Sequence, residues 1–219
     1  MPSQMSSTIG TKVIIALTGL ALFGFLITHL AGNLLILSGP EAFNGYSHKL
    51  LSNPLIYVAE AGLALLFVLH IWNTAGNYVR NRAARPSQYE MKRPAGHTSR
   101  KTLSSTWMIV SGTTILVFLI LHLKTLKFGP YYESTEPGVR DLYRLSIEVF
   151  QQPGYVIGYV VAMILVGMHL RHGITSALQS LGAIPSGHTR KVLAAGAAIA
   201  VLIAGGFAVI PIWIYFFTQ

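Results

Sequence analysis

The stretch VIIALTGLALFGFLITHLAGNLLIL, residues 13–37, decides the fold, because it is long enough to cross a membrane and its only ionisable residue is His29. A transmembrane helix needs about 20 mostly apolar residues. Four further stretches meet this requirement: 55–78, 106–126, 155–181 and 192–217. The sequence therefore predicts an all-α integral membrane protein of five transmembrane helices, with residues 1–219 forming a single transmembrane domain.

The composition supports this class of protein. Charged residues make up 11% of the chain, against about 25% in an ordinary soluble domain. The net charge of +9 comes from basic residues that cluster beside the apolar stretches, which favours a membrane orientation signal over nucleic-acid binding. Cysteine is absent, and this excludes disulfides, thiolate-held iron–sulfur clusters and the covalent attachment of c-type haem within the chain.

The connections between the spans predict how the chain sits in the membrane. The segment between the second and third spans holds one acid, Glu90, and a set of basic residues: Arg80, Arg82, Arg85, Lys92, Arg93, Arg100 and Lys101. Basic connections stay in the cytoplasm, so we expect a multi-pass protein of the cell inner (cytoplasmic) membrane with a cytoplasmic N-terminus. Before the fourth span, apolar residues at near-helical spacing over 139–150 predict a short amphipathic helix on the outer surface.

Four histidines lie inside the first four spans, at depths that form two layers. At 1.5 Å per residue, His29 and His122 each lie ~25 Å from the inner end of their spans. His70 and His169 lie ~21–23 Å from the outer end of theirs, close to the inner side. The depths predict an outer pair, His29 with His122, and an inner pair, His70 with His169, separated vertically by roughly 15 Å.

Two neutral imidazoles on opposite faces of a haem fill both axial positions, so the iron exchanges electrons and has no position left for oxygen. Ionisable residues within a membrane are functional candidates by default. The two layers therefore predict two haem b groups, held in a four-helix bundle of the first four spans. A zinc site is disfavoured, because its ligands converge on one point. His172 lies one turn beyond His169, and spacing alone leaves the choice between these two open.

Other polar residues near the spans are candidates for supporting roles. Glu60, just inside the outer end of the second span, is either a proton relay for a quinone or an interfacial acid bonded to a neighbouring helix. Residues that could line an outer quinone pocket are Asn33, Tyr46, His48 and Lys49. Lys124 and Arg171, each two residues from a proposed ligand, could bind haem propionates or extend to the membrane surface. Small residues that would admit a flat ring, or close helix packing, are Gly24, Gly62, Gly112 and Gly167.

Several longer motifs carry a family resemblance. They are HLAGNLL from His29, EAFNGYSHKL from Glu41, PLIYVAEAGLALLFVLHIW ending just past His70, LHLK around His122, and MHLRHGITSALQSLG around His169. With them the chain resembles the cytochrome b membrane-anchor subunit of succinate dehydrogenase/fumarate reductase, in the di-haem, five-span, single-anchor group. The resemblance implies the same pairing of histidines as the depths, and it favours His169 over His172.

The resemblance also implies partners and substrates. In similar complexes a flavoprotein subunit interconverts succinate and fumarate, and an iron–sulfur subunit docks on the cytoplasmic face of the anchor. Electrons run between the iron–sulfur centres, the inner haem, the outer haem and a quinone, commonly menaquinone, bound toward the outer haem. A higher oligomer of the complex stays open. Some fumarate reductases of the group carry a proton-conducting glutamate two positions before the fourth-span ligand, where this chain has Gly167.

Two alternatives stay open at this point. One is a di-haem cytochrome b that anchors another dehydrogenase or a hydrogenase, which would use the same ligands with other partners. The other is a non-redox, proton-coupled transporter in which the histidines relay protons. Haem content separates the transporter from both cytochromes, and the subunits that co-purify separate the two cytochromes.

Overall fold

The computed structural model describes residues 8–84 and 107–218, and this part of the chain is almost entirely helical. Five helices are long and apolar enough to cross a membrane, which confirms the predicted fold class. In the described residues they are α1 (Thr8–Leu34), α3 (Leu55–Ala83), α5 (Met108–His122) together with the turn that continues it to Lys127, α7 (Pro153–Ser180) and α8 (Thr189–Phe217). A 3₁₀ turn, η2 (Leu35–Ser38), extends α1, and a π-helical turn, η3 (Leu123–Lys127), extends α5 directly after His122. The predicted start of the third span and most of the basic connection, residues 85–106, lie outside the described residues.

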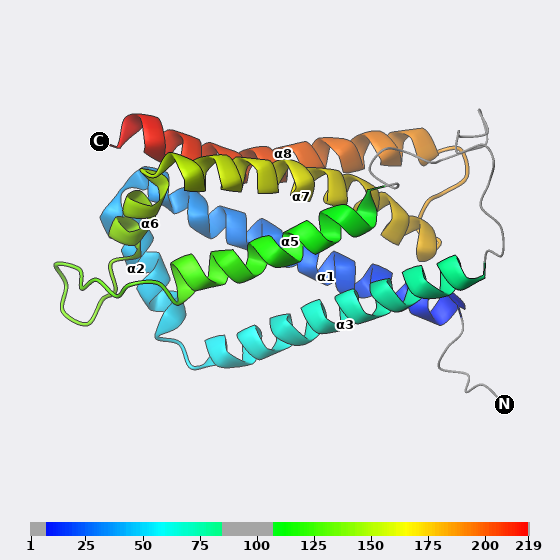
Figure 1. The fold of residues 1–219 in the computed structure, drawn as a ribbon, viewed down its shortest axis with the longest axis horizontal. Helices are drawn as coiled ribbons and strands as arrows, with labels where there is room; N and C mark the ends of the chain where they lie inside the picture. The colour runs from blue at the N-terminus through cyan, green and yellow to red at the C-terminus, as the bar shows by residue number, and fades with distance from the viewer. Residues whose placement is uncertain (1–7, 85–106, 219) are drawn as a thin grey trace.

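The tightest packing joins α7, α8 and α1, and small residues make it possible. Helices α7 and α8 run side by side along their length, with α1 against both (Figure 1). Gly167 of α7 faces Ala204 of α8 so closely that a Cβ at Gly167 would come within 3.0 Å of the Ala204 Cβ. Small residues let membrane helices approach in this way. Gly167 therefore serves helix packing, and the fifth span packs against the others as expected.

The remaining two spans complete a pair of hairpins. Helix α3 packs along α1, and α5 packs along α7. Neither is deeply enclosed: α3 has no buried residue, and the only buried residue of α5 is Ser111. The two hairpins, α1–α3 and α5–α7, meet chiefly through α1 and α7. The predicted four-helix bundle is thus present in part, with an ion pair between Glu60 of α3 and Lys127 of η3 linking the hairpins at one end.

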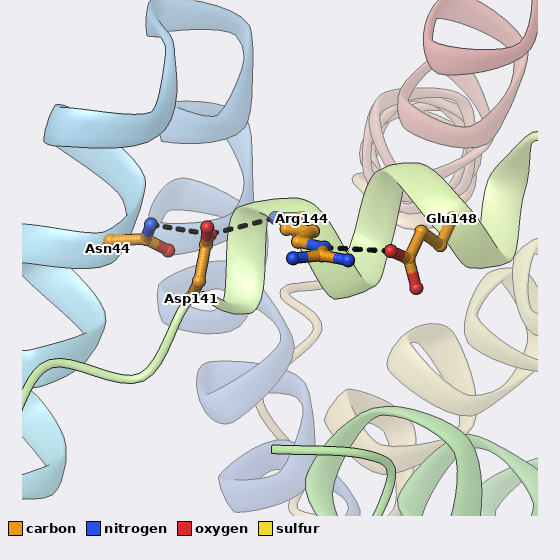
Figure 2. A network of polar contacts seen from close by, with 4 residues as sticks. All are labelled: Asn44, Asp141, Arg144 and Glu148. Carbon is orange, nitrogen blue, oxygen red and sulfur yellow. Dashed lines mark hydrogen bonds and ion pairs between the residues drawn. The ribbon is translucent and has the colours of Figure 1, made fainter. Parts of the chain in front are cut away.

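Two short helices, α2 (Pro40–Leu51) and α6 (Leu142–Phe150), cover the end of the bundle where α1 stops and α3 begins, here called the outer end (Figure 1). Helix α6 is the amphipathic helix expected from the sequence, whereas α2 was not predicted. The Asn44 amide donates to the Asp141 carboxylate (2.7 Å), which accepts from the Arg144 backbone N–H (2.9 Å) at the start of α6 (Figure 2). Arg144 in turn pairs with Glu148 at 2.8 Å. This network fixes α6 against α2.

The Arg140 side chain fixes the connection that enters this cap. Its guanidinium donates to four backbone carbonyls at and just beyond the end of η3, at 2.9–3.3 Å, and these belong to Leu126, Lys127, Gly129 and Pro130. Carbonyls at a helix end lack partners within the helix, so a multidentate cation there replaces the missing bonds. The position of η3, and with it that of Lys127, is therefore set by the outer connection.

Candidate functional site

The outer pair of histidines lies face to edge between two different hairpins. The ring centroids of His29 on α1 and His122 on α5 are 5.9 Å apart, and the ring planes are at 88°. Bonds between a metal and an imidazole nitrogen are about 2 Å long, so two imidazoles on opposite sides of one metal have centroids roughly 6 Å apart. The observed separation has the size that a shared axial site requires.

The inner pair is held by hydroxyl groups. The His70 Nδ1 on α3 lies 3.1 Å from the Thr18 Oγ1 on α1, and the His169 Nδ1 on α7 lies 3.2 Å from the Ser111 Oγ on α5. Each contact joins the two helices of one hairpin. Each inner histidine is thus steadied within its own hairpin, His70 by α1 and His169 by α5.

The hydroxyl contacts determine which ring nitrogen carries the proton. Thr18 donates its hydroxyl hydrogen to the Ile14 carbonyl (2.7 Å), and Ser111 donates its own to the Met108 carbonyl (3.1 Å). In this arrangement each hydroxyl oxygen accepts from the imidazole, and the proton sits on Nδ1. A neutral imidazole carries one proton, which leaves the Nε2 lone pair free. Histidines that bind metals are commonly held in this way, by a bond from the other ring N–H.

The outer histidines have different partners. The His122 Nδ1 lies 3.2 Å from the Tyr159 hydroxyl of α7. The His29 Nδ1 lies 3.3 Å from the Asn33 amide nitrogen, which also donates to the His29 carbonyl at 2.7 Å. An amide nitrogen only donates, so in this arrangement the His29 Nδ1 accepts and the proton sits on Nε2. The His29 ring also stacks on Phe25 and contacts Phe207 of α8.

A repeated motif supplies these contacts, and the sequence analysis missed it. Residues 18–29, TGLALFGFLITH, and 111–122, SGTTILVFLILH, share a hydroxyl, a glycine, a phenylalanine and a histidine at equal spacing. Phe25 and Phe118, each four residues before the outer histidine, contact its ring at 5.1 and 5.7 Å. A Cβ added at Gly19 or Gly112 would meet the inner imidazole of the same hairpin at 3.1 or 3.5 Å. Aligning the two spans on their histidines would have revealed this pattern.

Glu60 lines an apolar groove beside the outer pair. The groove lies between α1 and α3, has a volume of about 450 Å³, and includes Gly24, Gly62 and the Phe25 ring that stacks on His29. The Glu60 carboxylate is paired with Lys127, and both side chains are more than one third exposed. Of the two interpretations of Glu60, the bond to a neighbouring helix is present, and the carboxylate also borders the space where an apolar ligand would lie.

The other predicted residues are placed as follows. Asn33 contacts His29, whereas Tyr46, His48 and Lys49 are exposed on α2. Lys124 is exposed on η3. Arg171 lines a groove between α7 and α8, and two residues of helix turn it to nearly the opposite face from His169, so it is not brought to the inner pair. Within the described part of the chain, the His172 ring forms no hydrogen bond, unlike that of His169.

Comparison of the chain with models of protein families, with curated proteins and with solved structures finds no match in any of the three. Within residues 8–84 and 107–218, no three histidine or carboxylate side chains gather in a cluster that could hold a metal ion. The function proposed below therefore depends on the paired histidines and on the motifs around them.

Proposed function

We propose that this chain is the di-haem b membrane anchor of a succinate:quinone oxidoreductase, and that it connects an iron–sulfur subunit with membrane quinone. The observation that carries the proposal is the arrangement of the inner histidines. Two imidazoles from separate hairpins each have Nδ1 bonded to a buried hydroxyl, which leaves each Nε2 available for a metal. Histidines that only fill space or bond to the backbone do not require this orientation.

The residues fit two haem groups. His70 and His169 would hold the inner haem, and His29 and His122 the outer haem. When bound, each haem would supply an iron that gains and loses one electron, and the two histidines that hold it would leave no position for oxygen. Glycine next to each inner ring lets the imidazole lie against the neighbouring helix. Phe25 and Phe118 restrict rotation of the outer rings.

Quinone chemistry needs a group that carries protons near the outer site, and Glu60 is placed for this. Its carboxylate borders the groove between α1 and α3, which is otherwise lined almost wholly by apolar side chains. Lys127 pairs with this carboxylate, and a quinone, in our proposal menaquinone, would take protons from it or give them to it. The flavoprotein and iron–sulfur subunits would bind at the opposite, cytoplasmic end, with the N-terminus on the same side.

The test is a dithionite-reduced minus oxidised spectrum of the purified protein, with quantification of its haem as the pyridine haemochrome. We expect two low-spin b-type haems per chain. His48→Ala is the matched control for the ligand variants, because His48 is exposed on α2, and it should keep both haems. A preparation without haem from haem-replete cells would overturn the proposal and favour the proton-coupled transporter. Co-purification of a flavoprotein with fumarate- or succinate-dependent activity supports this anchor, whereas a hydrogenase points to the other cytochrome.

A further inference from the structure

The two hydroxyls behind the inner histidines, Thr18 and Ser111, are buried polar groups in otherwise apolar helices. Their residues are 6% and 2% exposed. Each hydroxyl satisfies its donor within its own helix, on the carbonyl of Ile14 or Met108, and its oxygen faces an imidazole of the other helix in the hairpin. Each hydroxyl therefore donates to a backbone carbonyl and at the same time accepts from an imidazole. That imidazole belongs to a histidine proposed to hold the inner haem, His70 or His169.

Hydroxyls in membrane helices usually bond only to the backbone of the preceding turn. Thr28 and Thr114 show this ordinary behaviour, since their hydroxyls bond to the carbonyls of Phe25 and Val110. The second contact, to an imidazole from another helix, distinguishes Thr18 and Ser111. It occurs twice, once in each hairpin, at the same distance of eleven residues before the outer histidine and directly before a glycine. Helix capping or backbone bonding alone does not explain that repetition.

We infer that Thr18 and Ser111 are positioning residues for the inner haem, which they control through the Nδ1 of its two ligands; this inference rests on the proposed function. A bond from Nδ1–H to an acceptor fixes the rotation of the ring and makes Nε2 a stronger base. A stronger base stabilises the ferric state more than the ferrous state. The two hydroxyls therefore lower the midpoint potential of the inner haem, and the outer haem has no equivalent pair.

The contact also prepares each hairpin for the haem. The hydroxyl and the histidine belong to the same hairpin, so the inner ligand is oriented before the two hairpins meet. Gly19 and Gly112 lie beside the imidazoles, and a Cβ at Gly19 would come within 3.1 Å of the His70 ring, so glycine there lets the helices approach closely enough for the bond. The contact between Asn33 and the outer histidine His29 does not orient a ligand in this way, since Asn33 directs the His29 proton to Nε2.

The experiment compares Thr18→Val and Ser111→Ala with the parent chain in a redox titration followed by optical and electron paramagnetic resonance spectra. Thr18→Val keeps the shape of the side chain and removes the acceptor. We expect an upward shift of the inner midpoint potential in both variants, an unchanged outer potential, and inner-haem affinity lowered by about 10- to 100-fold. His70→Ala identifies which signals belong to the inner haem.

Two controls separate positioning from structure. Thr18→Ser removes the methyl group of Thr18 and retains the hydroxyl. The midpoint potential of the inner haem in this variant should therefore equal that of the parent chain. Thr114→Val removes a hydroxyl of α5 that bonds only to its own helix, and it should move neither potential. If Thr18→Val does not fold, Ser111→Ala, a smaller change in the other hairpin, still decides the question.

Parent-like potentials and spectra of the inner haem in Ser111→Ala would overturn the inference, as would equal shifts of the inner and outer potentials. A failure of the proposed function is seen separately, because the parent chain would then hold no haem before any variant is made.

Discussion

The inner and outer histidine pairs differ in how they are prepared for a metal. In the arrangement described above, the inner imidazoles donate from Nδ1 to hydroxyl oxygens, so both present an unprotonated Nε2. The outer imidazoles contact a tyrosine hydroxyl and an asparagine amide, and the amide places the His29 proton on Nε2. The outer rings are instead held by contacts with aromatic rings: Phe25 stacks on His29, and tilted contacts join Phe207 to His29 and Phe118 to His122.

A histidine that binds a metal has to meet two requirements. The first is that its proton sits on the nitrogen that does not bind the metal, and the second is that its ring is held in place. The two pairs meet these requirements differently. The inner site meets both through the hydroxyl contact of each Nδ1. The outer site meets the second requirement by packing and leaves the first to be satisfied when a metal binds. If the outer pair holds a metal through Nε2, as we propose, His29 would have to give up the bond from Asn33, whereas the contacts of the inner pair already leave each Nε2 free.

Removing one ligand from each pair has the largest expected effect. His70→Ala should lose the inner haem while part of the outer haem stays, and His29→Ala should lose the outer haem and spare the inner one. Haem content per chain and the reduced spectrum of each variant measure this. Retention of both haems in either variant would refute the pairing.

Asn33→Leu sharpens the comparison, because it removes the amide that opposes ligation at His29. We expect the outer haem to bind more tightly by about fivefold, which corresponds to one neutral hydrogen bond of about 1 kcal/mol. Haem transfer to apomyoglobin gives the rate of loss for the comparison. Weaker binding would mean that Asn33 turns its oxygen to His29 in the loaded protein, and that both sites use acceptors.

Tyr159→Phe tests whether the outer site depends on its one hydroxyl. The phenol lies 3.2 Å from the His122 Nδ1, and the ring also packs against Phe118 and Phe150, which phenylalanine preserves. We expect the outer haem to be lost no more than about fivefold faster, since one neutral hydrogen bond is removed. If Tyr159→Phe weakened the outer haem as much as Thr18→Val weakens the inner haem, the outer site would depend on its hydroxyl contact as strongly as the inner site does.

The smallest effect is expected at the two short helices α2 and α6, which cover the outer end of the bundle and contact neither pair of histidines. The Arg144 guanidinium and the Tyr132 hydroxyl hold the pKa of the Glu148 carboxyl below its ordinary value. A lowered pKa in the folded state means that this contribution is present above the ordinary carboxyl pKa of about 4.3 and is lost as the pH falls below it. Proteolysis of the outer connection should accelerate on acidification, without change in the haem spectra. Glu148→Gln should abolish that part of the pH dependence.

Much of the fold could be predicted because apolar length decides it. The five spans follow from long runs of apolar residues. The predicted ends of the spans differ from the ends of the observed helices by a few residues. Helix α2 was missed because its residues are mostly polar, and it forms where Pro40 starts a helix and Phe43, Asn44 and Ser47 find a buried face. The π-helical turn after His122 gave no signal, since it depends on the Arg140 contacts from a distant segment.

The site was predictable in part. The histidines stood out, because ionisable residues are rare in lipid and so each one is conspicuous. Thr18 and Ser111 were not noticed, since small hydroxyls are common in membrane helices and bond harmlessly to their own turn. Only the packing of α1 on α3 and of α5 on α7 shows that these two face an imidazole. Arg171 lines the groove between α7 and α8, and its predicted role toward a haem propionate stays a prediction.

The hydroxyl contacts within each hairpin have a consequence for biosynthesis. The ribosome delivers α1 and α3 before α5 and α7, and the first hairpin carries a finished half of the inner site as soon as its two helices pair. The second hairpin arrives with the other half. The two hairpins otherwise meet mainly through α1 and α7. A haem bound between His70 and His169 would therefore hold the newly inserted hairpins together. Cells starved of haem should then accumulate the chain as two loosely associated hairpins, exposed to membrane proteases.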